Sequence, residues 1–204
     1  MDGINGMDGM DGMQQIWARI ETVLGRIAPK VLAAMPPGAT EEEIGTAQAV
    51  MGVEFPEDVK VSYRCRNGLP GVLIGWHAAL YSLGQMVNDW RERADDAGDP
   101  PEDDREADGV IRRDISWSAG WIPFIGIGNG DVICIDLDPP TPERRGQIID
   151  WSHEGWRARY ETAGLREFLR EFASDLEADR YEVDDAGNKW SDNGLPLLSL
   201  KATG

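Results

Sequence analysis

The segment from Pro37 to Gly68 carries the densest set of helix start and stop signals in this chain of 204 residues. Thr40 followed by Glu43 is a capping box, in which each side chain satisfies a backbone N–H that the helix leaves unpaired. Apolar residues then recur on one helical face, and Gly52 supplies the left-handed residue that commonly ends a helix. The face residues are Ile44, Ala47 and Met51. This pattern predicts a short amphipathic helix.

A second short helix is predicted after a tight turn of sequence Gly-Val-Glu-Phe-Pro. Pro56 is expected to open this helix, because a proline in the first helical position loses no hydrogen bond. Val59 and Tyr63 share one face of it, and Asn67 with Gly68 provides a left-handed stop. The spacing therefore predicts two helices joined by a turn.

Downstream of this pair, apolar segments with the composition of strands are frequent. Strands are expected at 71–76, 80–83, 121–125, 132–137, 147–151 and 156–160. Short connections between consecutive strands favour antiparallel pairing. Residues 184–188 have the composition of a turn, and we expect them to join a terminal hairpin between Tyr181 and Trp190.

Three further helices follow from apolar spacing and capping residues. A stripe over 16–31 predicts an N-terminal helix, and a stripe over 165–176 predicts the cleanest amphipathic helix of the chain. Ser82 with Gln85 is a second capping-box candidate, which opens a helix through Trp90. The fold class is therefore α+β, with N-terminal helices, a central mostly antiparallel sheet and a C-terminal amphipathic helix.

The length of the chain suits one well-packed core, and we expect a single domain over residues 14–190. The repeated Met-Asp-Gly of residues 1–13 is expected to form a flexible leader, with Met13 as an alternative start. The stretch 95–108 is acidic, contains Pro-Pro and lacks apolar periodicity, so we expect a surface loop inside the domain. An apolar C-terminal tail follows over 191–204.

The composition bears on the class of partner. The chain has 37 acidic and 20 basic side chains, which gives a formal net charge of -17. Such a surface repels phosphates, so neither nucleic acid nor an anionic membrane is an expected partner. No apolar run approaches the roughly 20 residues that a membrane span needs. The charge favours a basic protein partner, and a solvated acidic surface explains it equally well.

The two cysteines, Cys65 and Cys134, are scattered and do not form a disulfide framework. This usage is typical of a reducing compartment. The N-terminus also lacks the basic and apolar regions of a secretory signal. We therefore expect a cytoplasmic protein.

Two groups of residues resemble sites for ions, and each has a simpler structural interpretation. The glycine-rich segment 126–131 is suited to cradle a phosphate, but a strand and not a helix is expected after it, which favours a turn between strands. Asp136 and Asp138, with Asp131 nearby, are suited to bind a cation or to act as an acid/base pair. No EF-hand spacing accompanies them, and Asp138 precedes two prolines, as a turn-initiating aspartate does.

His77 and His153 are the two histidines of the chain. Neither lies near a nucleophile elbow or in a zinc-binding spacing, so we assign no catalytic residue, no metal and no cofactor. Surface or interface positions are the favoured interpretation for both.

The chain has eight tryptophans. Trp121 and Trp151 fall inside expected strands and are expected to be buried, while several others flank loops. Tryptophan is enriched at the energetic centres of interfaces, although packing in the core or at an edge is its more frequent role. The residues that we assign to partner binding are Trp76, His77, Trp117, Asp131, His153 and Trp156.

The order of these motifs resembles the SUKH superfamily, in particular the yeast cell-wall-assembly-regulator (Smi/Knr) group and its bacterial relatives. The shared elements are Gly38 to Ile44, the Gly52 to Asp58 turn, Tyr63, Asn67-Gly68, Trp121 to Phe124, Gly130-Asp131, Cys134 to Pro139 and Gly146 to Ile148. The resemblance runs from about Trp17 to Tyr181, and it implies the same α+β fold.

The resemblance also implies a function. Bacterial members are similar to immunity proteins, which neutralise secreted toxins by direct binding, and many of these toxins are nucleases and therefore basic. It thus implies a non-enzymatic protein-binding module with a basic toxin domain as partner, as a monomer or a homodimer. The yeast group implies an alternative, a regulatory scaffold of cell-wall and signalling assemblies. A small-ligand domain that uses residues 126–131 is the third hypothesis.

Overall fold

The computed structural model describes residues 5–70, 79–95, 106–127, 129–153, 157–184 and 197–200. The elements are α1 (Asn5–Ile27), α2 (Pro29–Ala34), α3 (Glu41–Met51), α4 (Glu57–Cys65), β1 (Ala79–Leu80), α5 (Leu83–Asp95), β2 (Trp121–Gly126), β3 (Val132–Asp136), the short 3-10 helix η1 (Pro142–Arg144), β4 (Gln147–Ser152), β5 (Arg157–Thr162), α6 (Leu165–Glu177), β6 (Tyr181–Asp184) and β7 (Leu197–Leu200).

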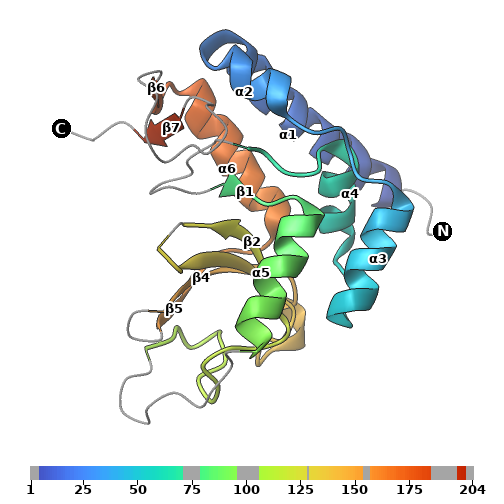
Figure 1. The fold of residues 1–204 in the computed structure, drawn as a ribbon, viewed down its shortest axis with the longest axis vertical. Coiled ribbons are helices and arrows are strands. Elements are labelled where there is room, and N and C mark those ends of the chain that lie inside the picture. The colour runs from blue at the N-terminus through green and yellow to red at the C-terminus, as the bar shows by residue number, and fades with distance from the viewer. Residues whose placement is uncertain are drawn as a thin grey trace.

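The centre of the fold is a five-stranded sheet in the order β1-β2-β3-β4-β5. Every pair in it is antiparallel, and each strand pairs with its neighbour in the sequence (Figure 1). Outside the sheet, Ala107 forms a parallel bridge to Ala158 of the edge strand β5, so the described end of the acidic segment partly covers that edge. The predicted α+β class with antiparallel pairing is confirmed.

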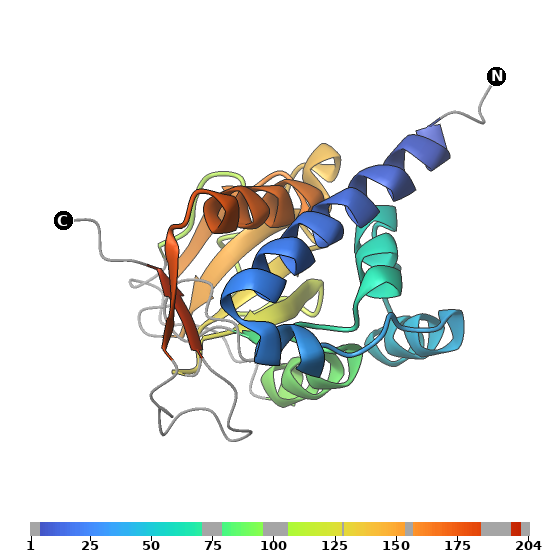
Figure 2. The same ribbon diagram turned by 90° about the horizontal axis from the view of Figure 1, so that it is seen from above.

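One face of the sheet packs against the helices. Helix α6 lies over this face, and α1 packs on the outer side of α6 (Figures 1 and 2). The core between the layers includes Ile122, Phe124, Ile135, Ile148, Leu169 and Phe172. Burial of one such side chain contributes about 2 kcal/mol to folding, so this layer supplies much of the driving force.

The other face of the sheet carries a smaller apolar cluster, which the segment 106–120 covers. The cluster consists of Ile111, Trp117, Trp121, Val132, Cys134, Ile149, Trp151 and Ala158. Trp121 and Trp151 are 1% and 5% exposed, which confirms their predicted burial.

The capping signals of the sequence fix the helix starts. Thr40 N donates to Glu43 Oε2 at 2.7 Å, and Glu43 N donates to Thr40 Oγ1 at 3.2 Å, so the predicted capping box is present. Gly52 ends α3 with a φ of 67° in the left-handed region. Ser82 and Gln85 form the second predicted capping box ahead of α5. Because α5 begins at Leu83, the strand predicted at 80–83 is limited to Ala79–Leu80.

The ends of α4 differ slightly from expectation. Pro56 occupies the N-cap position with extended backbone, so the helix begins one residue later, and it ends at Cys65 before the predicted stop. Gly68 has a φ of 94°, and a Cβ there would lie 2.7 Å from Ser82 N. Glycine is therefore required at this position both for its backbone angle and for a close approach of two chain segments.

Helix α1 begins at Asn5, inside the segment 1–13 that the sequence predicts as a leader. Its first turns extend past the other helices (Figure 2). Met13 is fully buried because it continues the apolar face of Ile16 and Trp17, and Trp17 Nε1 donates to Ser62 Oγ at 3.1 Å. None of the helices in the described ranges is both long and apolar enough to cross a membrane.

In the terminal hairpin, the first strand pairs with a different segment from the one predicted. Strand β6 pairs with β7, in a register that sets Tyr181 opposite Leu200, so the predicted pairing between Tyr181 and Trp190 was wrong. The run Leu-Leu-Ser-Leu of the tail supplies the strand instead. Trp190 and the strand predicted at 71–76 lie outside the described residues.

Candidate protein-binding site

A hollow of about 430 Å³ lies between α5, the loop before β3 and the end of β4. It is lined by Asp89, Glu92, Arg93, Trp117, Gly130, Trp151 and His153. Two of the residues assigned to partner binding, Trp117 and His153, line it, and a third, Asp131, contacts His153. The other three assigned residues, Trp76, His77 and Trp156, lie outside the described part of the chain.

Arg93 links α5 to the sheet across this hollow. Its guanidinium carbon lies 5.3 Å from the ring centroid of Trp117 and 5.1 Å from that of Trp151. Its Nε pairs with Asp89 Oδ2 at 2.9 Å, one turn earlier on the helix. Its Nη2 donates to the carbonyl of Gly130 at 3.0 Å. A cation held over aromatic faces and paired with a carboxylate fixes the helix relative to the strands.

The tryptophans form a rigid floor. The rings of Trp117 and Trp151 meet edge to face with centroids 5.1 Å apart, and Trp121 meets Trp117 in the same way at 5.8 Å. Trp151 Nε1 donates to the carbonyl of Ser116 at 3.0 Å. Edge-to-face packing of this kind adds about 1 kcal/mol per pair beyond burial, so these side chains are already ordered before a partner arrives.

Asp131 and His153 form a hydrogen-bonded pair at one side of the hollow. Asp131 Oδ1 accepts from His153 N at 3.0 Å and lies 2.8 Å from His153 Nδ1. Burial disfavours the charged carboxylate, but hydrogen bonds from His153 and Asn129 outweigh it and lower the pKa of Asp131. Asp131 is therefore an anion at neutral pH. Gly130 has a φ of 100°, and a Cβ there would come within 3.0 Å of His153 Nδ1.

Among the described residues in and beside the hollow, acidic side chains outnumber basic ones. None of the lining residues is a cysteine. Asp89 pairs with the guanidinium of Arg93, Glu92 also lines the hollow, and Asp131 contacts His153. Burial raises the pKa of the Cys134 thiol well above its usual value, so this cysteine in the neighbouring cluster is not a thiolate nucleophile.

The remaining aspartates of the sequence analysis have structural roles in the described fold. Asp136 is fully buried, and its carboxylate accepts from Gln147 Nε2 at 2.8 Å and from Asp138 N at 2.9 Å. Asp138 accepts from Arg112 at 2.6 Å and from Ser118 at 2.7 Å. Across the described residues, no three His, Cys, Asp or Glu side chains come together as metal ligands would.

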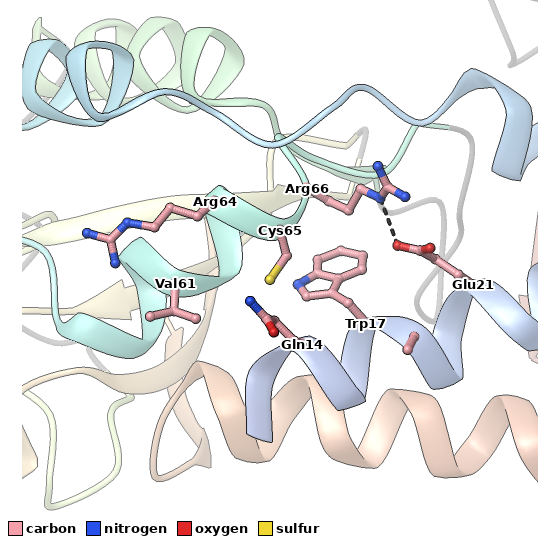
Figure 3. Close-up of a pocket in the computed structure, with 8 residues that line it drawn as sticks. Gln14, Trp17, Glu21, Val61, Arg64, Cys65 and Arg66 are labelled. Atoms are coloured by element: carbon pink, nitrogen blue, oxygen red, sulfur yellow. Dashed lines mark hydrogen bonds and ion pairs between the residues drawn. The ribbon is translucent and has the colours of Figure 1, made fainter. Parts of the chain in front are cut away.

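A second hollow, of about 290 Å³, lies between α1 and α4 (Figure 3). Trp17 and Cys65 face it from the two helices, and Arg66 pairs with Glu21 at 2.8 Å beside it. Arg64 is likewise paired, to Glu41 at 2.6 Å and to Glu57 at 2.8 Å. Burial raises the pKa of Cys65. Each charged side chain that lines this hollow is therefore already paired within the chain.

The model of the SMI1 / KNR4 family (SUKH-1) matches residues 38–196, which span α3 to β6 and include the whole hollow beside α5. The chain belongs to this family. It is also similar to KNR4/SMI1 homolog 2 of Debaryomyces hansenii, with 37% identity over 65 residues. The match covers 32% of this chain and 11% of the yeast protein, so the chain spans a small part of that relative's length. The resemblance seen in the sequence is confirmed, and family membership supports a protein-binding or immunity-type domain.

The sequence did not indicate four of the residues that line the hollow as site residues: Asp89, Glu92, Arg93 and Trp151. The pair Asp89 and Arg93 has the i,i+4 spacing of a helical ion pair, which is the local signal that was available for it. No local signal indicates that Arg93 meets two tryptophans from distant parts of the chain.

Proposed function

We propose that this SUKH-family chain is a non-enzymatic immunity-type protein, which binds and neutralises a basic toxin domain. The observation that carries the proposal is the hollow beside α5, which has a floor of tryptophans. Its carboxylates are those of Asp89 and Glu92, with Asp131 beside His153. The net charge of -17 also attracts a basic partner at long range.

The two parts of the hollow have different roles in this proposal. The side chains of Trp117 and Trp151 are buried and are held by their mutual packing and by Arg93, so the hollow has a fixed shape and little conformational entropy is lost when a partner binds. The carboxylates at the rim attract lysine and arginine side chains and raise the association rate. A nuclease is a suitable toxin class, because a nucleic-acid-binding surface is basic.

A regulatory scaffold is the second candidate. The similarity to the yeast protein over 65 residues favours it, because the yeast group implies a role in cell-wall and signalling assemblies. In that case the partner is a component of a larger assembly and not a toxin. Both candidates are protein-binding modules, and we place both in a reducing compartment, in agreement with the two free cysteines Cys65 and Cys134.

Co-expression with the products of the adjacent genes tests the proposal. A neighbouring toxin should arrest growth when it is expressed alone, and this chain should restore growth and co-purify with the toxin in a stoichiometric complex. The association rate should fall steeply between low and physiological salt, since the Debye length shortens to about 8 Å at 0.15 M. Binding to a neighbour-encoded protein that is not toxic supports the scaffold, and the absence of any complex contradicts both candidates.

A further inference from the structure

A second surface lies on the opposite side of α5 from the hollow. Helices α3 and α5 pack side by side (Figure 1). An open groove of about 480 Å³ lies between them. Its apolar lining comes from Ala47, Val50, Leu83, Gly84 and Val87. Gly84, Asn88 and Arg91 line the groove from one face of α5. Asp89 and Arg93 line the hollow from the opposite face, with Glu92 between the two. No residue lines both surfaces.

Two of the residues that line the groove, Ala47 and Gly84, are small. A Cβ added to Gly84 would meet no atom closer than Ser82 Oγ at 4.0 Å. Val50, which also lines the groove, is 37% exposed, more than any other large apolar side chain in the described part of the chain. The lining spans positions 83–91 of α5, which corresponds to about 12 Å of helix, or a little over two turns.

The two ends of the groove carry opposite charges. Both helices start near Asn67, whose Oδ1 accepts from Leu83 N at 2.8 Å and whose N donates to the carbonyl of Pro37 at 3.1 Å. Glu42 therefore lies at the end where the helices begin, and Arg91 lies toward the other end. Within the described residues, no hydrogen bond or ion pair within the chain joins either side chain to a partner. The two ends of the groove therefore differ: one carries an exposed negative charge and the other an exposed positive charge.

We propose that this groove binds an amphipathic helix of a protein partner. Such a helix lays apolar residues at i, i+4 and i+7 over Ala47, Val50 and Val87, as helices do in hydrophobic grooves. It carries a lysine or arginine at the end that faces Glu42, and an aspartate or glutamate at the end that faces Arg91. This surface is independent of the hollow, and it gives the chain a second point of contact with a partner.

The test uses a displayed library of 15-residue helices with a fixed apolar face and random residues at both ends. Helices sorted for binding to the wild-type chain should be enriched in basic residues at one end and acidic residues at the other. The double variant Glu42→Lys with Arg91→Glu should enrich the reversed arrangement. Gly84→Leu fills the groove with a side chain and should weaken each selected helix at least tenfold.

Two controls separate the proposal from its rivals. His153→Ala alters the hollow at a residue outside α5 and should leave the selected helices bound. Sedimentation velocity on the wild type and on Val50→Lys shows whether a second copy of the chain occupies the groove. Failure to select any helix, binding that Gly84→Leu does not weaken, or a dimer that Val50→Lys dissociates would overturn the proposal.

Discussion

Replacing Arg93 by glutamine tests whether the guanidinium stabilises the packing of α5 on the sheet. Glutamine removes the charge and both cation–π contacts, while its amide stays polar in the same place. The Arg93 and Asp89 side chains are 16% and 20% exposed, so the change occurs in a partly desolvated position. The variant therefore probes the floor of the hollow without altering its tryptophans.

The structure gives the expected size of the effect. Each contact of the guanidinium with Trp117 or Trp151 is worth about 1 kcal/mol in a partly desolvated setting, so the two together contribute about 2 kcal/mol. The carboxylate of Asp89 is then left mostly buried without its partner, which costs about 1 kcal/mol more. Arg93→Gln should therefore lower the free energy of unfolding by about 3 kcal/mol.

Urea unfolding followed by tryptophan fluorescence measures this change. Arg91→Gln is the matched control on the same helix, and because Arg91 is exposed we expect it to stay within about 0.5 kcal/mol of the wild type. The double variant Asp89→Asn with Arg93→Gln removes the unpaired carboxylate and should recover about 1 kcal/mol. A loss below about 1 kcal/mol in Arg93→Gln, or no recovery in the double variant, would refute this reasoning.

Three further changes test the fold. Thr40→Ala removes the capping box of α3 and should cost about 1 kcal/mol in urea unfolding. Gly68→Ala combines a left-handed φ with a clash against Ser82 N and should cost about 2–4 kcal/mol, seen as a lower midpoint with an unchanged slope. Burial, and secondarily the charge of Asp131, raise the pKa of Asp150, so the fold disfavours its charged form. Asp150→Asn should therefore raise the melting temperature at pH 8, and the gain should shrink as the pH falls through the folded-state pKa, where the wild-type carboxyl is protonated.

The features that the sequence predicts correctly depend on neighbours within a few residues. The capping boxes of Thr40 with Glu43 and of Ser82 with Gln85 are local hydrogen-bond patterns, and they appear as expected. The order of β2 to β5 follows from short connections, because consecutive strands of an antiparallel sheet usually pair. Strand β1 pairs with β2 across a longer connection that contains α5. Local chemistry and connection length therefore account for most of the architecture.

The features that the sequence does not predict depend on contacts between distant segments. The partner of β6 is set by the tail at Leu197–Leu200, while the turn-like residues 184–188 indicate a nearer partner. In the hollow, Arg93 meets Trp117 and Trp151, which come from separate parts of the chain. No periodicity or motif relates these three positions, so their contact follows only from the packing of α5 on the sheet.

The most direct test of the proposed interface is the affinity of the neighbour-encoded toxin for two charge-reversal variants. Glu92→Lys reverses an exposed charge at the rim of the hollow, and Glu143→Lys makes the same change in η1, which precedes β4 and lies at the opposite end of that strand. Isothermal titration should show at least tenfold weaker binding for Glu92→Lys and wild-type binding for Glu143→Lys. Equal affinities for the two variants would contradict the assignment of this hollow as the toxin-binding site.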